Sequence, residues 1–295
     1  MVQNVLKTLH KLGVRKTHLV HPSVRFLAQL CSRRGMIPHN ALMGAPLDVS
    51  FDIRLPGASF EYHVTSDDPL GARLFWQEWQ RWEPYVVPQF ARFVRNSRRV
   101  VDIGAHTGIY SLFACALNSS CEVFAFEPFP PIYARLAENI RLNGFESRIR
   151  SFQAAVSDLD GTGRLHIAPD VTMCALSDSC GELEVPLVTL DQIIPLDRGT
   201  GLVKMDVEGH ENRVFRGMER VVQDSHPVII FECNPGAAAA DVDEWLRQRG
   251  YHIFSLIDGV VEEISELRPE RFEFGNHNFL ATHRSHFGQD TPSIR

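Results

Sequence analysis

Short apolar runs alternate with stretches of helical period from Arg99 onward. This alternation is typical of a parallel sheet whose two faces are covered by helices. We therefore expect an α/β fold with a doubly wound, seven-stranded, mostly parallel sheet. The predicted strands are residues 100–104, 122–127, 149–156, 202–206, 228–232, 252–257 and 279–282.

Helical periods fill most of the gaps between these runs. The predicted helices are residues 110–117, 132–143, 211–222 and 241–249. Residues 161–186 are instead rich in Gly, Ser, Asp and β formers, which predicts an inserted hairpin or loop. No helical period separates the last two strands, so we expect them to form an antiparallel pair at the sheet edge.

The first third of the chain has a different pattern. Residues 47–64 alternate apolar and polar positions around Pro56 and Gly57, which predicts a β-hairpin. A helix start at Asp67, Asp68 and Pro69 then precedes four aromatic residues that share one helical face, Phe75, Trp76, Trp79 and Trp82. That face either packs on the body of the protein or forms a lid over a substrate pocket. We expect an N-terminal extension over residues 1–97 and a main domain over residues 98–295.

Charge is distributed unevenly along the chain. The whole sequence has 30 Lys and Arg against 36 Asp and Glu, a net charge of -6, which argues against a general nucleic-acid binder. Residues 1–47 nevertheless contain no acid and seven basic residues, Lys7, Lys11, Arg15, Lys16, Arg25, Arg33 and Arg34. We expect a basic helix that docks on the protein itself, with membrane-surface contact or targeting as the alternative.

No apolar run is long enough to span a membrane, and the six cysteines include no C-x-x-C pair. These features predict a cytoplasmic protein with reduced thiols. Cys174 and Cys180 form the one pair to check for a disulfide.

Two glycines, Gly104 and Gly108, follow the first predicted strand and precede a helix. Their spacing is not the dinucleotide fingerprint, and the lysine of a phosphate-binding loop is absent. Asp102 near the turn would repel phosphate and attract a cationic ligand. Glu127, nineteen residues after Gly108, is placed to accept hydrogen bonds from ribose hydroxyls. A ligand with a ribose, an ammonium and no phosphate fits S-adenosylmethionine, whereas the structural alternative is a tight turn capped by Asp102.

Four segments of the chain resemble the FkbM-type methyltransferases, S-adenosylmethionine enzymes that mostly methylate hydroxyls on sugars and natural products. The segments are residues 101–108, 126–128, 154–158 and 203–209. The resemblance implies a Rossmann-like methyltransferase domain. The cofactor-binding residues that we predict on this basis are Asp102, Gly104, His106, Thr107, Gly108 and Glu127, with Asn143 and Asp158 near the adenine or ribose. Family members usually have Asn in the place of His106.

A second polar cluster surrounds the end of the fourth predicted strand. Lys204 and Asp206 share a face of that strand, and a buried lysine needs a carboxylate partner, either Asp206 or Asp102. Asp206 or His210 is the candidate base for removing a hydroxyl proton. Glu208 and Glu211 either interact with the start of the next helix or, for Glu208, bind substrate.

The end of the fifth predicted strand adds Glu232 and Asn234. These side chains either bind substrate hydroxyls directly or, together with Asp206, hold Mg²⁺.

The sequence therefore predicts an S-adenosylmethionine-dependent O-methyltransferase acting on a small hydroxylated acceptor. One alternative is a Mg²⁺-dependent O-methyltransferase of the catechol type. Another is a non-catalytic methyltransferase fold that serves as an interaction or membrane-surface module. A nicotinamide-dependent dehydrogenase would need the missing glycine pattern, and N-methylation is left open.

Overall fold

The structure of the protein is a computed structural model that describes residues 47–55, 58–65, 68–77, 83–168, 174–177, 181–197, 199–235, 238–257, 260–271 and 277–286. The predicted basic arm, the Pro56-Gly57 turn, Trp79, Trp82 and Cys180 lie outside these residues. Within them, no helix is both long and apolar enough to cross a membrane. The described chain divides into two compact units, one up to Glu83 and one from Pro84 onward. The predicted boundary at residue 98 stays a prediction.

The first unit contains a β-hairpin and a helix. Strands β1 (Asp48–Leu55) and β2 (Ala58–Thr65) pair antiparallel, as predicted, and α4 (Pro69–Gln77) follows them. Alternate residues of both strands are buried, and Phe51 lies edge-on to Phe75 with their ring centroids 5.2 Å apart. Part of the predicted aromatic face therefore packs on the hairpin. Its interpretation as a lid stays a prediction.

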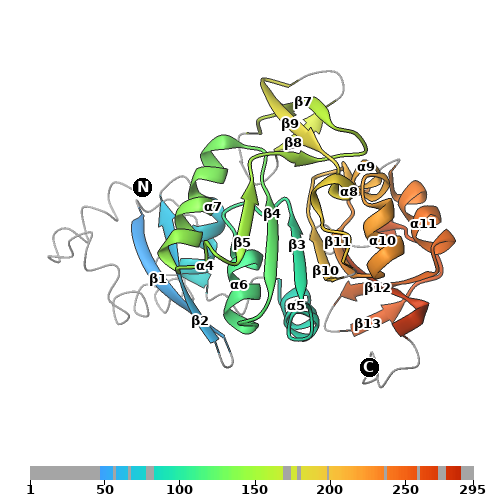
Figure 1. The fold of residues 1–295 in the computed structure, drawn as a ribbon, viewed down its shortest axis with the longest axis horizontal. Helices are drawn as coiled ribbons and strands as arrows, with labels where there is room; N and C mark the ends of the chain where they lie inside the picture. Colours follow the sequence, from blue (N-terminus) through green and yellow to red (C-terminus); the bar gives the residue numbers. More distant parts are fainter. Residues whose placement is uncertain are drawn as a thin grey trace, which may run out of the picture. The chain divides into compact units, whose positions relative to one another are not determined.

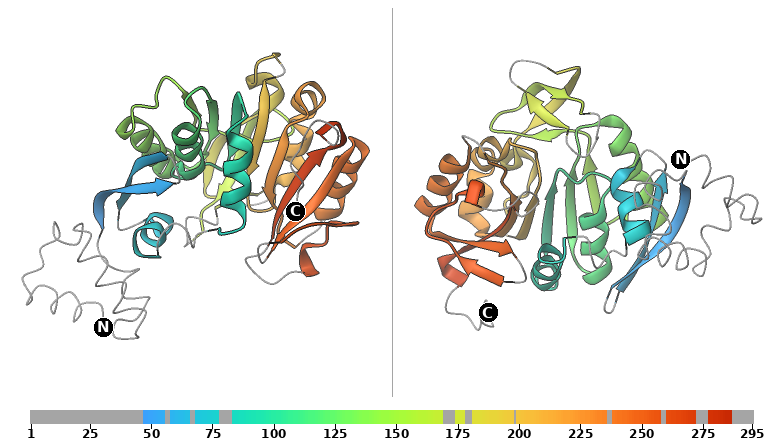
Figure 2. Two further views of the ribbon diagram at one scale, coloured as in Figure 1. Left: turned by 90° about the horizontal axis from the view of Figure 1, so that it is seen from below. Right: turned by 180° about the vertical axis from the view of Figure 1, so that it is seen from behind.

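The second unit is built on an eight-stranded sheet with the order β13-β12-β14-β11-β10-β3-β4-β5 (Figure 1). The five parallel strands are β3 (Arg99–Ile103), β4 (Glu122–Phe126), β5 (Ile149–Phe152), β10 (Thr200–Met205) and β11 (Val228–Glu232). The antiparallel strands are β12 (Tyr251–Ile257), β13 (Val260–Glu263) and β14 (Asn278–His283). The green β5 end and the red β12–β13 end form opposite edges of this sheet (Figure 2). The predicted doubly wound, mostly parallel class is confirmed.

The sheet has one strand more than the sequence predicts. Strand β13 pairs antiparallel with β12 and carries exposed acids, Glu262 and Glu263, so it lacks the apolar run of a central strand. The last two predicted strands do form an antiparallel pair. The outer edge, however, belongs to β13, and β14 lies between β12 and β11.

The predicted strand over residues 149–156 is wrong as a single element. The chain bends at Gln153 and Ala154, so that β5 stays in the large sheet and β6 (Ala155–Val156) joins a second sheet of order β6-β9-β7-β8. The other strands of this second sheet are β7 (Gly161–His166), β8 (Ala175–Ser177) and β9 (Leu183–Val188). The inserted hairpin is thus confirmed as an antiparallel β7–β9 pair, drawn at the top of Figure 1.

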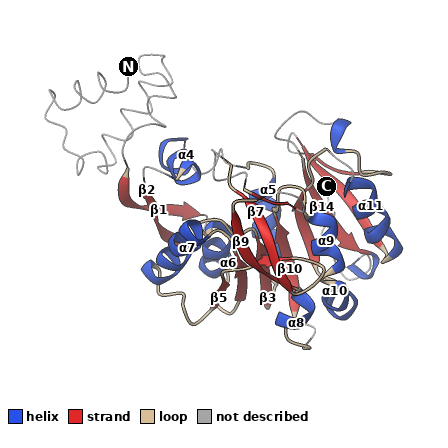
Figure 3. Ribbon diagram, turned by 90° about the horizontal axis from the view of Figure 1, so that it is seen from above, coloured by secondary structure: helices blue, strands red, loops and turns tan. Residues whose placement is uncertain are grey.

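Helices cover the large sheet. Those from the first half of the unit are α5 (Val86–Val94), α6 (Ile109–Leu117) and α7 (Pro130–Leu142). Those from the second half are α8 (Leu190–Ile193), α9 (Glu211–Arg216), α10 (Glu219–Ser225) and α11 (Ala238–Gln248). Helices α6 and α7 lie toward the β5 side, and α9 to α11 lie toward the β14 side (Figure 3).

The single helix predicted over residues 211–222 is wrong, because α9 and α10 are separated by a turn at Gly217 and Met218. A Cβ at Gly217 would lie 1.9 Å from the carbonyl oxygen of Ser157. The close approach of these two backbones therefore requires glycine, the residue that favours a helix end over a helix interior.

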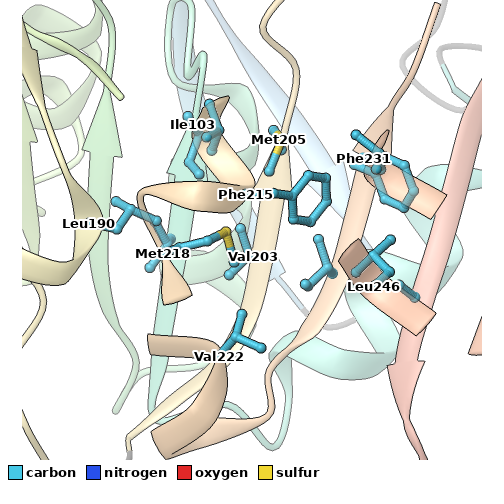
Figure 4. Close-up of a cluster of buried hydrophobic side chains, with 14 of the residues drawn as sticks. Ile103, Leu190, Val203, Met205, Phe215, Met218, Val222, Phe231 and Leu246 are labelled. Carbon is cyan, nitrogen blue, oxygen red and sulfur yellow. The ribbon is translucent and has the colours of Figure 1, made fainter. Parts of the chain in front are cut away.

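The core uses alternate residues of the central strands. Ile103, Val203, Met205 and Phe231 face α8 to α11 and form one apolar cluster with Phe215 (Figure 4). Because side chains alternate across a sheet, Asp102 and Lys204 project to the other face, where α6 packs. The two faces of one strand thus carry different chemistry.

Candidate functional site

Strands β3 and β10 are neighbours at the point where the order of the sheet reverses. From β3 the chain continues to β4 on one side, and from β10 it continues to β11 on the other. Ligands of open α/β sheets bind at the carboxyl ends of the strands beside such a switch point. The predicted residues Gly104, Glu127, Asp206 and Asn234 follow β3, β4, β10 and β11 there.

The glycine turn is held by backbone contacts. Gly104 and Ala105 donate N–H hydrogen bonds to the Phe126 carbonyl oxygen at 3.0 and 2.9 Å. A Cβ at Gly104 would lie 1.8 Å from the carbonyl oxygen of Asp206, and one at Gly108 would lie 2.5 Å from Leu136 Cδ1. The sequence suggested that these glycines give room to a ligand. In the structure, atoms of Asp206 and Leu136 occupy the positions that side chains at Gly104 and Gly108 would need, so close packing within the protein itself requires glycine here.

Two glycine substitutions near the site distinguish the cost of backbone strain from the cost of steric overlap with neighbouring atoms. Gly104 and Gly209 both have a positive φ, +75° and +97°, but no atom lies within 4 Å of a Cβ at Gly209. We expect Gly209→Ala to cost about 1 kcal/mol of unfolding free energy from backbone strain alone. Gly104→Ala should cost more than about 3 kcal/mol, because β3 and β10 must also separate. Urea unfolding checks this difference, and equal losses would contradict the contact.

Glu127 is a buried carboxylate next to the glycine turn, with 7% of its surface exposed. Its Oε2 accepts the His106 N–H at 3.0 Å, and its Oε1 accepts the Phe129 N–H at 2.8 Å. Burial raises the pKa of Glu127 to about 7, against the lowering effect of the two backbone donors. Each carboxylate oxygen has two lone pairs. Beyond these two bonds, Glu127 can therefore accept two hydroxyl donors, as a vicinal diol would supply.

Asp102 and Lys204 form the charged centre under the turn. Asp102 is 2% exposed, and its Oδ2 accepts a 2.6 Å hydrogen bond from Ser111. Lys204 lies opposite Asp102 in the β3–β10 register, and its Nζ is 3.7 Å from Asp206 Oδ2 and 5.3 Å from the Tyr110 ring centroid. Burial raises the pKa of Asp102 to about 6, although Ser111 and Lys204 oppose the rise. Asp206 and Asp102, the two predicted carboxylate partners, therefore both interact electrostatically with Lys204.

The predicted residue Asn143 is connected to the glycine turn through a residue that the sequence did not single out. Asn139 donates to the carbonyl oxygen of buried Thr107 at 3.0 Å, and Asn143 donates to the Asn139 carbonyl oxygen at 2.8 Å. Helix α7 thus anchors the turn. No motif pointed to Asn139.

Asp158 and His210 are brought together by Ser157. The Ser157 hydroxyl oxygen lies 3.0 Å from His210 Nε2 and donates to Asp158 Oδ1 at 3.1 Å. Ser157 is fully buried. One ring nitrogen of the candidate base His210 therefore contacts the segment that carries Asp158. The resemblance to the family places Asp158 near the adenine or ribose of the cofactor.

Glu208 and Asn234 contact each other at the ends of β10 and β11. Asn234 Nδ2 donates to Glu208 Oε2 at 3.2 Å, and Asn234 Oδ1 lies 3.0 Å from His277 Nδ1. His277 precedes β14 and was not predicted, because it is 43 residues from Asn234 along the chain. Only the inserted position of β14 in the sheet brings them together.

The remaining acids have separate surroundings. Glu211 is buried and accepts the Gly209 N–H at 2.8 Å, which agrees with its interpretation as an acid at a helix start. Burial raises its pKa. Glu232 lies opposite Asn278 in the β11–β14 ladder.

The predicted Mg²⁺ site at Asp206, Glu232 and Asn234 stays a prediction. In the part of the chain that the structure describes, no group of three or more His, Cys, Asp or Glu side chains is arranged to hold a metal ion. The amide oxygen of Asn234, the atom that a cation would need, lies against His277.

The doubly wound sheet, with its glycine turn and buried acid at the switch point, is a Rossmann-like fold. Residues 102–253, just over half of the chain, match the Methyltransferase FkbM domain. The chain therefore belongs to the FkbM methyltransferase family and is a methyltransferase, which confirms the resemblance seen in its motifs.

Three known proteins illustrate this similarity. The 31-O-demethyl-FK506 methyltransferase FkbM of Streptomyces tacrolimicus is 27% identical over 255 residues, 72% of this chain and 92% of that protein. The hexuronic acid methyltransferase AglP of Haloferax volcanii is 30% identical over 162 residues, 50% of this chain and 60% of that protein. The crystal structure of methyltransferase FkbM from Methylobacillus flagellatus KT has a TM-score of 0.41 at 20% identity, over 63% of this chain and 44% of that one.

Proposed function

We propose that the protein transfers a methyl group from S-adenosylmethionine to a hydroxyl of a small acceptor, a sugar or a natural product. The observation that carries this proposal is the Glu127 carboxylate, which two backbone N–H groups hold at the switch point of the sheet. The relatives named above, one for a 31-O position and one for a hexuronic acid, support the acceptor class.

The charges of the site suit a cationic cofactor without phosphate. Asp102, Glu127, Asp206 and Glu208 outnumber the buried cation Lys204. Such an excess of negative charge attracts a sulfonium and an ammonium and repels phosphate. When bound, S-adenosylmethionine would supply an electrophilic methyl group. The electron pair of the broken carbon–sulfur bond would stay on the sulfur.

Each predicted cofactor residue has a role in this proposal. Glu127 accepts the ribose hydroxyls, and Asp102 supplies negative charge from below the turn. The other predicted contacts are Gly104, His106, Thr107 and Gly108 of the turn, with Asn143 and Asp158 toward the adenine or ribose.

On the acceptor side, Asp206 and His210 are the predicted proton acceptors, and Glu208, Glu232 and Asn234 bind acceptor hydroxyls. A hydroxyl must lose its proton when it is methylated, and positioning it in line with the methyl group supplies much of the rate. In the catechol-type alternative, Asp206, Glu232 and Asn234 would instead hold Mg²⁺.

Calorimetric titration of the full chain with S-adenosylmethionine and S-adenosylhomocysteine, with and without Mg²⁺, tests this proposal. We expect micromolar binding of both, about -8 kcal/mol. Tighter cofactor binding in the presence of Mg²⁺ would favour the catechol-type alternative. Absence of binding to a folded sample would favour the non-catalytic alternative instead.

A further inference from the structure

Three histidines meet at the end of β14. His226 directly follows α10, His283 is the last residue of β14, and His286 ends the short 3₁₀-helix η5 (Arg284–His286). The rings of His226 and His283 are stacked, with their centroids 3.9 Å apart and an interplanar angle of 3°. The His286 ring lies edge-on to His283 at 6.4 Å. Because β14 runs antiparallel to β11, this cluster lies at the opposite end of the strands from the candidate functional site.

The hydrogen bonds of His283 require a neutral ring. Its Nδ1 accepts the Ser285 N–H at 3.2 Å, and the Ser285 hydroxyl oxygen lies 2.7 Å from the same nitrogen. A ring nitrogen that accepts an N–H carries no hydrogen itself, so the ring hydrogen of His283 must be on Nε2. A second proton would have to bind Nδ1, where it would face the Ser285 N–H. Protonation of His283 therefore breaks this contact.

The surroundings of His283 also disfavour a positive charge. The residue is 7% exposed, and its neighbours from α10 and η5 are the basic residues His226, Arg284 and His286. Burial, together with these three side chains, lowers the pKa of His283 from 6.5 to about 4. Hydrogen bonding and electrostatics thus both favour the neutral ring in the folded protein.

The groups that β12 contributes to the cluster do not reverse this preference. Tyr251 lies edge-on to His283 with ring centroids 5.3 Å apart, and its hydroxyl donates to the Pro227 carbonyl oxygen at 3.0 Å. The Arg249 guanidinium donates to Glu219 at 2.9 and 2.5 Å, so this nearby acid already has a cationic partner. A backbone hydrogen bond at Arg249 raises the pKa of His283, but its effect is smaller than that of burial.

The cluster closes the end of a strand that holds two parts of the sheet together. Strand β14 pairs with β11 on one side and with β12 on the other, and all six of its residues are buried. His283 lies opposite Tyr251 at the end of the β12 ladder. His226 has a φ of +46°, a left-handed conformation that persists where the surrounding structure fixes it. The stacked rings therefore join the end of α10 to the end of β14.

We propose that the His226–His283 stack is a proton-operated latch, which holds the end of β14 in place at neutral pH and releases it in acid. A proton from solvent that binds His283 Nδ1 displaces the Ser285 N–H and places a positive charge beside Arg284 and the His226 ring. The open form of the strand binds this proton more tightly than the closed form does. The contribution of His283 to stability is therefore full above pH 6.5 and is lost as the pH falls toward 4.

Hydrogen exchange of the full chain between pH 7.5 and pH 4.5, corrected for the intrinsic exchange rate, tests this latch. We expect the protection of residues 251–257 and 278–283 to fall about tenfold per pH unit below about pH 6, because one proton binds the open form in preference to the closed form. Residues 99–103 and 122–126, in β3 and β4, should not show this fall. Constant protection of β12 and β14 over this pH range would overturn the inference.

Two variants identify the histidine that is responsible. In His283→Asn the amide oxygen can still accept the Ser285 N–H, but the side chain does not titrate, so most of the fall in protection should be lost. His252→Gln is the matched control, because His252 lies on the other face of β12, where its Nδ1 is 2.7 Å from Glu263. It removes a titrating ring from the same strand pair and should keep the fall. A full pH dependence in His283→Asn would show that the inference is wrong.

Nitrogen NMR of histidine-labelled wild-type protein tests the closed latch without a substitution. The His283 ring, assigned through its contact with the Tyr251 ring, should carry its hydrogen on Nε2 at pH 7. It should still be mostly neutral at pH 5, where an ordinary histidine is protonated. A hydrogen on Nδ1 at pH 7, or a fully protonated ring at pH 5, would contradict the latch.

Discussion

Replacement of Glu127 by Gln should weaken S-adenosylmethionine binding about a hundredfold or more, because two hydrogen bonds from hydroxyls to a charged acceptor are lost or distorted. In the structure both Glu127 oxygens already accept backbone N–H groups, from His106 and Phe129. Glutamine has one oxygen and one NH₂ group, so one of these backbone donors would face another donor. We expect an additional loss of about 1–3 kcal/mol of unfolding free energy.

Calorimetry at pH 8 measures this effect, with thermal unfolding to show that the variant is folded. Glu146→Gln, on the exposed turn after α7, is the matched control and should bind as wild type does. Unchanged affinity in Glu127→Gln would remove Glu127 from the cofactor site.

The pH dependence of binding gives a second measure of the same carboxylate. Its pKa is raised to about 7 by burial, and only the ionised form can accept two hydroxyl donors. Cofactor affinity of the wild-type protein should therefore fall about tenfold per unit as the pH drops below 7. Glu127→Gln should lack this slope, so parallel pH profiles of the two proteins would contradict the assignment.

Lys204→Met should destabilise the protein by roughly 3–5 kcal/mol at pH 8, the usual cost of removing one partner from a buried ion pair. Lys204 is 1% exposed and lies between Asp206 and Asp102. Methionine fills a similar volume but leaves the buried Asp102 carboxylate without a nearby cation. Because methionine keeps the packing of the strand, the loss of unfolding free energy measures mainly the effect of removing the positive charge.

The cost should depend on pH with a definite sign. The pKa of Asp102 is raised by burial from 3.8 to about 6, so the folded state holds this proton more tightly than the unfolded state does. The contribution of Asp102 to stability is therefore full below 3.8 and is lost as the pH rises through 6. Without Lys204 that pKa rises further, and a protonated Asp102 needs no cation. Lys204→Met should therefore cost less at pH 5 than at pH 8.

Urea unfolding at the two pH values checks this expectation. The double variant Lys204→Met with Asp102→Asn should recover part of the loss at pH 8, because the uncompensated charge is gone. An equal loss at both pH values with no recovery would show that Lys204 acts through packing alone.

The central strands were predictable because their burial on both faces leaves an apolar run in the sequence. Strand β11 was predicted at its observed bounds, Val228–Glu232, since its first four residues are all buried and apolar. Strand β13 was missed because an edge strand needs no such run and carries acids instead. The division of residues 149–156 was missed because no Gly or Pro marks the bend at Gln153 in the sequence.

The candidate site was predictable where neighbouring residues form a motif. The glycine turn and Glu127 meet as the spacing indicated, through the His106 N–H. Ser157, Asn139 and His277 were not predicted, because each acts through a contact between segments that are far apart in the sequence. Only the topology of the sheet brings those segments together.

Strand β14 lies between β11 and β12 although it is the last of the described strands along the chain. During synthesis on the ribosome, β12 and β13 emerge before it and can pair with each other, but their link to β11 is not yet made. The nascent sheet therefore stays open at this point until residues 278–283 have left the exit tunnel. Loss of that strand by an early stop codon would detach β12 and β13 and leave the β11 edge unprotected against aggregation.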